Sequence, residues 1–326
     1  MVAIPMGLSP DRVRRLRLAA QRLSPGNQAR DAHEAAAAVC GVQAQDLRAA
    51  ALALRARVPG LERSAIREAG LVRVWTVRGT IHMLPARDWP WMYAAVGERF
   101  LARMEQILAK RGALQLARSV LGDLIALISE QPLTRAEILA ELQRRGHARF
   151  DGGPVNVLMP WVVLQGLAVG DSEGRWLASD PPARVDPDEA LATLARRYLA
   201  GYRPATAGDL ARWSGLALGT ARRALEAAGT PDEDPDPPAP GPARLLGGFD
   251  PVMLGYESRE PVLAAEHDRR ILPGGGILKA VVLSRGRAVG TWRLAGSRLD
   301  VDWFGRRPAR DALSAETADV VRFLSA

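Results

Sequence analysis

The chain is poor in the residues that build disulfides and metal sites. Among its 326 residues there is a single cysteine, Cys40, so no internal disulfide can form and a cysteine-built metal site is excluded. The four histidines, at positions 33, 82, 147 and 267, are too far apart in the sequence to suggest a metal site. We therefore expect a protein of a reducing compartment that uses no metal and no other cofactor.

Long apolar segments and the common catalytic motifs are also missing. No apolar run reaches the length needed to cross a bilayer, and the N-terminal "MVAIPMGLSP" lacks the charged start and apolar stretch of a signal peptide. We therefore predict a cytoplasmic location and no membrane partner. The sequence has no Gly-x-Ser-x-Gly, no metal-ligand spacing and no nucleotide-binding fingerprint, which argues against a hydrolase built on serine or zinc.

Lysine is scarce, with only Lys110 and Lys279, and arginine supplies nearly all of the positive charge. The formal net charge is +8 and is unevenly distributed, because residues 1–118 carry +10 and the remainder carries −2. A basic N-terminal third indicates a polyanionic partner, and nucleic acid is the commonest polyanion available to a cytoplasmic protein. We therefore expect association with the nucleoid.

The order of helices and short strands predicts a mainly α-helical, α+β fold of tandem winged helix-turn-helix units. The middle of the chain is the most regular, with three helices, a capping box from Thr134 to Glu137 and a two-stranded wing. A similar order of helices then follows, and Thr206 stands before its middle helix. The predicted units are an N-terminal winged-helix-like domain (1–118), a second winged helix (119–184), the helical part of a third (185–230), an acidic, proline-rich linker (231–242) and a β-rich C-terminal region (243–326).

Two glutamines, Gln43 and Gln45, interrupt an alanine-rich and leucine-rich stretch, "VCGVQAQDLRAAALALRAR". Two residues apart on a helix, they would point in nearly opposite directions, whereas in an extended segment both would lie on one side. Gly41 is a plausible helix stop and Asp46 a good N-cap, so the segment between them is free to extend. The pattern predicts a paired amide site, although amide side chains that simply bond to loop backbone would give the same pattern.

Other candidates are less specific. Arg78, Thr80 and His82 alternate in "RVWTVRGTIHMLP", so a regular strand would place them on one face, as either a site or a solvated surface. Asp250, after two glycines and before a proline, fits either an Asx-turn or an acidic group at a domain junction. The candidate DNA-binding residues are Arg12 and Arg15 on the first helix and Arg285 and Arg287 at the hairpin turn spanning Ser284–Arg287, where solvation is the alternative. The triple glycine 274–276 predicts a turn, because no phosphate-loop signature follows it.

Four stretches together resemble the AlkZ-like DNA glycosylases, a winged-helix family that excises alkylated purines and unhooks some interstrand crosslinks. They are "VQAQD", "RVWTVRGTIHMLPARD", "FDPVMLGY" and "GRAVGTWR", and the similarity extends over nearly the whole chain. The family signature is Gln, a spacer and Gln, with Asp at the second position in a sister branch, so Gln43-Ala44-Gln45 matches the Gln/Gln branch. The resemblance implies tandem winged helices in a C-shaped DNA cradle, a β-hairpin that probes the duplex, and catalysis by Gln43 and Gln45.

The chemistry implied by the resemblance is monofunctional hydrolysis at a cationic alkylated purine. The glycosidic bond to such a base is already weakened, so two neutral amides that position water suffice and no strong acid is required. A bifunctional enzyme attacks through an amine, and neither Lys110 nor Lys279 stands beside a recognisable carboxylate. Two alternatives remain: a non-enzymatic winged-helix DNA-binding regulator, and a damaged-DNA sensor without turnover. A self-contained cradle predicts a monomer acting on double-stranded DNA.

Overall fold

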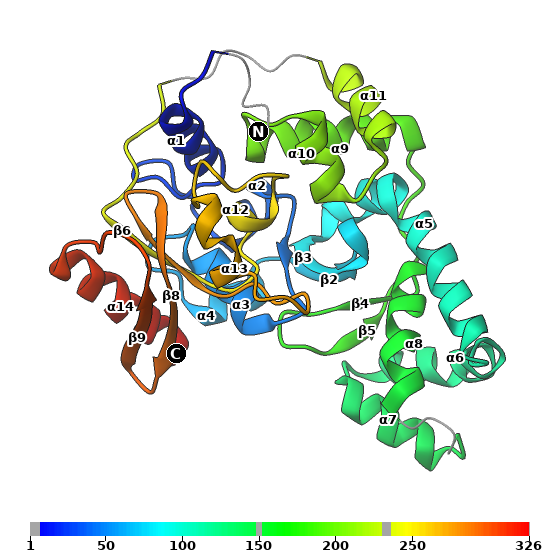
Figure 1. The fold of residues 1–326 in the computed structure, drawn as a ribbon. Coiled ribbons are helices and arrows are strands. Elements are labelled where there is room, and N and C mark those ends of the chain that lie inside the picture. Colours follow the sequence, from blue (N-terminus) through cyan, green and yellow to red (C-terminus); the bar gives the residue numbers. More distant parts are fainter. Residues whose placement is uncertain (1–6, 148–151, 230–235, 326) are drawn as a thin grey trace.

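The computed structural model describes residues 7–147, 152–229 and 236–325 and confirms the predicted α+β class (Figure 1). Its α-helices are α1 (Pro10–Ala20), α2 (Ala32–Ala38), α3 (Leu47–Arg55), α4 (Arg63–Glu68), α5 (Trp89–Lys110), α6 (Leu114–Glu130), α7 (Arg135–Arg144), α8 (Gly152–Leu164), α9 (Pro187–Tyr202), α10 (Ala207–Ser214), α11 (Leu218–Ala228), α12 (Pro251–Leu254), α13 (Asp268–Ile271) and α14 (Arg310–Ser325). The described 3₁₀ turns are η1 (Val77–Gly79), η2 (Ala86–Asp88) and η3 (Ala265–His267).

The strands form two antiparallel sheets. The first has the order β1-β3-β2-β4-β5 and consists of β1 (Val42–Gln43), β2 (Leu71–Trp75), β3 (Ile81–Pro85), β4 (Ala168–Gly170) and β5 (Trp176–Ala178). The second has the order β6-β7-β8-β9 and consists of β6 (Ala243–Leu246), β7 (Val281–Ser284), β8 (Arg287–Ala295) and β9 (Arg298–Trp303). In Figure 1 the strands β2 and β3 lie between the C-terminal sheet on one side and helices α5 to α8 on the other.

Capping side chains mark the starts of helices near the N-terminus, and Asp46 is one of them as predicted. Ser9 accepts a hydrogen bond from the backbone N–H of Arg12 and Asp46 accepts one from Ala49, so both act as N-caps. α2 ends just before Cys40 and Gly41, which adopt φ values of 53° and 95°. These positive angles stop the helix, and the chain then forms the short strand β1 and bends at Gln45 and Asp46 before α3 begins.

The stretch "RVWTVRGTIHMLP" does not form one regular strand. The chain forms the two antiparallel strands β2 and β3, joined through η1, where Arg78 has a φ of 57° and Gly79 a φ of 69°. Apolar and polar residues alternate through the whole stretch, which conceals the turn, and only the Arg-Gly pair marks it. Arg78 therefore occupies the turn, while His82 lies in β3.

The middle of the chain has the predicted order of three helices and a two-stranded wing. α7 starts with the capping box of Thr134 and Glu137, and β4 pairs with β5 after α8. The wing also joins the N-terminal strands, because Arg73 of β2 pairs with Gly170 of β4 and the rings of Trp75 and Trp176 stack at 5.4 Å. One sheet therefore spans the predicted boundary at residue 118, and the domain limits themselves remain predictions.

The last third of the chain is held by two apolar clusters. The rings of Tyr198 and Tyr202 stack on each other, and both pack at a tilt against Trp213 of α10. All three belong to the larger core, which continues into the N-terminal sheet. A smaller cluster packs Leu18 of α1 against Leu246 and other residues of the C-terminal region. Residues 230–235 of the predicted linker lie outside the described residues.

Within the described ranges, no single helix is long and apolar enough to span a membrane. Only a bent pair, Ala86–Lys110 with Leu114–Glu130 at 116° to each other, reaches the required length and composition together.

Candidate active site around Gln43 and Gln45

The backbone from Gly41 to Asp46 places Gln43 in the strand β1 and Gln45 at the bend before α3. β1 pairs with β3, with Gln43 opposite His82, and the N–H of Ala44 donates to the carbonyl oxygen of Ile81 at 2.8 Å. At position 41 only glycine fits, because a Cβ there would lie 3.1 Å from Cβ of Leu84 in a backbone with positive φ. The predicted break between two helices therefore has a specific conformation, fixed by pairing with β3.

Of the two glutamines, only Gln45 reaches the surface, because Gln43 is buried together with its neighbours in the chain. Val42 and Ala44 are fully buried, Gln43 is 7% exposed and Gln45 is exposed. The side chains of Gln43 and Gln45 meet, with Nε2 of Gln43 donating to Oε1 of Gln45 at 3.3 Å. The two amides thus form one hydrogen-bonded pair, with its inner member in the protein and its outer member at the surface.

Arg78 fixes the orientation of this pair. Its Nη2 donates to Oε1 of Gln43 at 3.1 Å, and its Nη1 donates to the backbone oxygen of Trp213, at the end of α10, at 2.6 Å. A guanidinium can only donate, so the oxygen of Gln43 must face Arg78 and its NH₂ must face Gln45. Burial is the main cause that lowers the pKa of Arg78, and an arginine remains cationic at neutral pH despite such a shift.

Thr80 and His82 lie close to the pair without joining its hydrogen bonds. The hydroxyl of Thr80 donates to the backbone oxygen of Val77, which closes the turn η1. Nδ1 of His82 lies 3.0 Å from Oγ1 of Thr76 and 3.1 Å from the backbone oxygen of Thr80. The expectation that Arg78, Thr80 and His82 share one strand face is wrong, because the turn sends their side chains to different partners.

The pKa of His82 is lowered to about 3, first by burial and then by the positive charge of Arg78, so the imidazole is neutral near pH 7. In the unfolded chain the histidine binds a proton near pH 6.5, whereas in the folded chain it does so only near pH 3. The contribution of neutral His82 to the free energy of unfolding is therefore fully present above pH 6.5 and is lost as the pH falls toward 3. From pH 6.5 to pH 4.5, we expect the wild-type free energy of unfolding to fall by about 2 to 3 kcal/mol more than that of His82→Asn. Urea unfolding at both pH values measures this difference, and equal losses in the two proteins would contradict it.

Asp250 is a core residue whose described hydrogen bonds go to Arg57 and Val252 and not to either glutamine. It is fully buried, and its two carboxylate oxygens accept hydrogen bonds from Nη1 and Nη2 of Arg57, both at 2.9 Å. Its Oδ1 also accepts from the N–H of Val252, which caps α12. Both sequence interpretations thus describe part of the arrangement, namely an Asx-type cap and an acidic group held between segments of the chain.

The four arginines predicted to bind DNA fall into two groups. Arg12 forms an ion pair with Asp236 at 3.4 Å, and Nη2 of Arg15 donates to the backbone oxygen of Pro237 at 2.6 Å, so both contact the end of the predicted linker. Arg285 and Arg287 are exposed at the turn between β7 and β8. This turn packs on α1, because a Cβ at position 286 would lie 2.5 Å from Cδ1 of Leu18.

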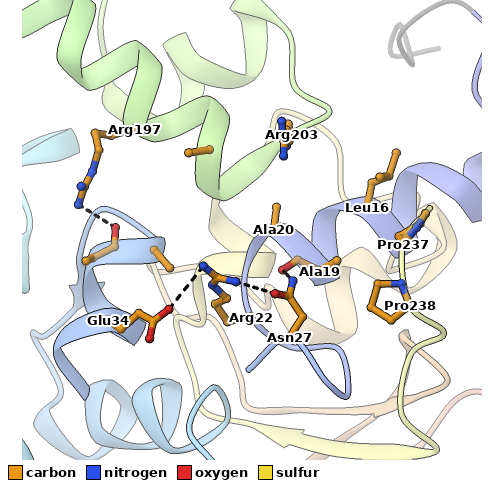
Figure 2. Close-up of a pocket in the computed structure, with 13 residues that line it drawn as sticks. Leu16, Ala19, Ala20, Arg22, Asn27, Glu34, Arg197, Arg203, Pro237 and Pro238 are labelled. Carbon is orange, nitrogen blue, oxygen red and sulfur yellow. Dashed lines mark hydrogen bonds and ion pairs between the residues drawn. The ribbon is translucent and has the colours of Figure 1, made fainter. Parts of the chain in front are cut away.

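The contribution of α10 to this region could not be predicted from the sequence. Trp213 accepts from Arg78 across 135 residues of sequence, and Arg99 of α5 donates to the backbone oxygen of Gly215 beside it. The pocket in Figure 2 does not coincide with the glutamine pair. It has a volume of about 510 Å³, lies among α1, α2, α9 and Pro237–Pro238, and is lined by neither glutamine. Among the described residues, no group of three or more histidine, cysteine or carboxylate side chains could hold a metal ion.

Comparison with known proteins gives consistent matches over nearly the whole length. The family model described as "DNA glycosylase AlkZ-like" matches residues 36–323. A protein of Streptomyces sahachiroi described as an interstrand DNA cross-link repair glycosylase is 27% identical over 94% of this chain and 94% of its own. The solved structure of the Streptomyces sahachiroi DNA glycosylase AlkZ superimposes with a TM-score of 0.76, at 24% identity, over 98% of both chains, and therefore shares the fold.

Proposed function

Because the chain belongs to the AlkZ-like DNA glycosylase family, we propose that it hydrolyses the N-glycosidic bond of cationic N7- or N3-alkylated purines in double-stranded DNA. We further propose that Gln43 and Gln45 position the attacking water, and that the enzyme acts as a monomer on chromosomal DNA. The observation that carries the proposal is the hydrogen-bonded amide pair, with its inner amide anchored by Arg78 and its outer amide exposed.

The proposed step needs no acid. The bond between C1′ and the alkylated purine breaks, and its electron pair neutralises the positive charge of the departing base. Water then adds to C1′ and loses a proton to solvent, which leaves an abasic sugar. The side-chain oxygens of Gln43 and Gln45 each accept one hydrogen bond within the protein, so each keeps a lone pair for the water and for the positive charge that develops on the sugar.

The neutral state of His82 agrees with this mechanism. A histidine whose pKa is about 3 carries no proton to give to a leaving base near pH 7. An undamaged purine, which requires protonation before it departs, would therefore survive in the same site. Selectivity would come from the reactivity of the lesion, and the same logic extends to purines that are alkylated within an interstrand crosslink.

The test of this function is base release from duplex DNA containing 7-methylguanine, followed by an assay on a duplex crosslinked through N7 of guanine. We expect free base and an intact abasic strand. Borohydride should not trap a covalent protein–DNA adduct, because neither Lys110 nor Lys279 is proposed as a nucleophile. Binding to these duplexes without base release would instead indicate a regulator or a sensor, and an adduct trapped by borohydride would overturn the monofunctional assignment.

Arg78 is proposed as a positioning residue, and the variant Arg78→Gly tests this role. Glycine accepts the positive φ at this turn, while the loss of the guanidinium frees the amide of Gln43 to rotate. We expect single-turnover base release to fall about 10- to 100-fold, which is the scale of losing an orienting contact, with little change in DNA affinity. Millimolar guanidinium should restore part of the rate by occupying the vacated space.

A purely structural role for Arg78 would give a different result. Guanidinium would then leave the rate of Arg78→Gly unchanged, or it would raise the rate of every variant equally. Gln45→Ala is the matched control, since it retains Arg78 and should not be rescued.

A further inference from the structure

We propose that Arg14, Arg285, Arg287 and Arg306 form a pocket that binds a phosphate group. The pocket has a volume of about 360 Å³ and is open to solvent on one side of the molecule. It lies where α1 meets the turn between β7 and β8 and the turn after β9. Figure 1 shows the β7–β8 turn reaching toward α1.

The strongest evidence for the pocket is the unsatisfied guanidinium of Arg14. Its side chain is only 7% exposed, yet neither Nε nor Nη1 has a hydrogen-bond acceptor among the described residues. Only Nη2 is paired, with Asp11 on the same helix. A buried guanidinium with two unsatisfied donors costs free energy unless an acceptor arrives, and Arg14 lines the pocket into which such an acceptor could enter.

The charges around Arg14 strengthen this interpretation. Arg285, Arg287 and Arg306 line the same pocket, and all three are exposed and form no ion pair with a described residue. Burial and, second, the positive charge of Arg287 lower the pKa of Arg14, which shows that like charges face each other here. Four guanidinium groups at one cavity repel one another until an anion neutralises them.

The acidic groups nearby do not compensate for these arginines. Asp11 has a 59% exposed side chain and binds Arg14 from outside, while Glu266 is 78% exposed and lies 3.7 Å from Nε2 of His267. The ring of His267 lines the pocket and packs against Phe304 at 4.6 Å. The floor is apolar, formed by Val262, Ala288 and Val289, so the polar contacts in the pocket come mainly from the guanidinium groups.

A phosphate group matches this donor set better than a carboxylate does. Planar guanidinium groups bind phosphate oxygens with two parallel hydrogen bonds, and a tetrahedral anion can accept from several arginines at once. The group could belong to the DNA backbone or to a free phosphorylated molecule. Binding of DNA phosphate rests on the proposed function, whereas binding of free phosphate does not, so the two sources can be distinguished.

The first measurement is titration of the full-length protein with inorganic phosphate by isothermal calorimetry at constant ionic strength. We expect saturable binding in the wild type and an affinity about 10- to 100-fold lower in Arg14→Met and Arg287→Met, the scale of a lost charge-assisted hydrogen bond. Arg298→Met, at an exposed arginine outside the pocket, should bind phosphate like the wild type. Because Arg287 is exposed, its variant decides the outcome even if Arg14→Met fails to fold.

The second measurement identifies the source of the phosphate. If it is a DNA phosphate, Arg287→Met should weaken binding to undamaged duplex and reduce the slope of log K against log salt by about one. If DNA binding is unchanged while phosphate affinity falls, the site serves a free phosphorylated ligand. Non-saturable phosphate binding in the wild type, or equal affinity in the wild type and Arg287→Met, would overturn the site. Both of these outcomes would overturn the phosphate site alone. The proposed glycosylase function is tested separately, by base release from the wild type.

Discussion

Replacing Gln45 with alanine is expected to lower the single-turnover release of 7-methylguanine by about 100-fold or more, while DNA affinity changes little. Gln45 is exposed, and its described side-chain hydrogen bond is the one that it accepts from Gln43, so we expect its removal to leave the fold intact. It also removes the outer acceptor proposed to hold the water. Loss of one preorganised electrostatic contact in an active site costs on the order of 10² to 10³ in rate.

Gln43→Ala should reduce base release at least as strongly, for an additional reason. Without the oxygen of Gln43, Nη2 of the half-buried Arg78 loses its acceptor, so part of the effect would be structural. The variant therefore needs a stability measurement beside its rate. Gln45→Ala is the cleaner test because its side chain lies in solvent.

Two controls make the result on Gln45 specific. Gln115→Ala, at an exposed glutamine of α6, should release base like the wild type. Fluorescence anisotropy with the same duplex should give similar dissociation constants for all three proteins. If Gln45→Ala retains more than a third of the wild-type rate, the amide pair is not the catalytic centre and water must be positioned by other groups.

The local features of the site could be predicted from the sequence because they depend on short-range rules. The break that holds the two glutamines is defined by a glycine that can stop a helix, Gly41, and by an aspartate that can cap the next one, Asp46. Both lie within three residues of Ala44. The structure confirms both, with Gly41 at a φ of 95° and Asp46 capping α3. The direct contact between the two amides follows from this segment, although the hydrogen bond itself required coordinates.

The contacts that orient the amides could not be predicted, because they depend on packing between distant segments. Arg78 was expected on a strand face, but the chain turns at that residue and directs it to Gln43 and to Trp213. No local pattern connects residue 78 with residue 213. The orientation of the Gln43 amide therefore depends on how α10 packs on the turn η1.

The arginines of α1 show the same limitation. Solvation is the ordinary expectation for arginine side chains such as those of Arg14 and Arg17. In the structure both are buried, since Arg17 pairs with Asp209 at 3.4 Å and stacks over the ring of Tyr256 at 3.6 Å. Arg17 is thereby satisfied, whereas Arg14 keeps two free donors. This difference between neighbouring arginines could be found only in the fold.

Breaking the ion pair of Arg57 and Asp250 is expected to have the largest effect on stability. Both side chains are fully buried, and Arg57 also donates to Gln21, which in turn donates to the hydroxyl of Tyr256. Removing one partner of a buried pair leaves an uncompensated charge, which costs about 3 to 5 kcal/mol. Arg57→Met should therefore unfold at a much lower urea concentration than the wild type.

The double variant Arg57→Met with Asp250→Asn separates the structural role of Asp250 from a role in the site. It removes both charges, and an asparagine oxygen can still accept from the N–H of Val252, so we expect it to recover more than half of the stability lost in Arg57→Met. If it also releases base at the wild-type rate, Asp250 contributes only to the fold, which agrees with its hydrogen bonds to Arg57 and Val252. A stable double variant without base release would instead show that the carboxylate acts on catalysis, through the core that connects α12 to α3.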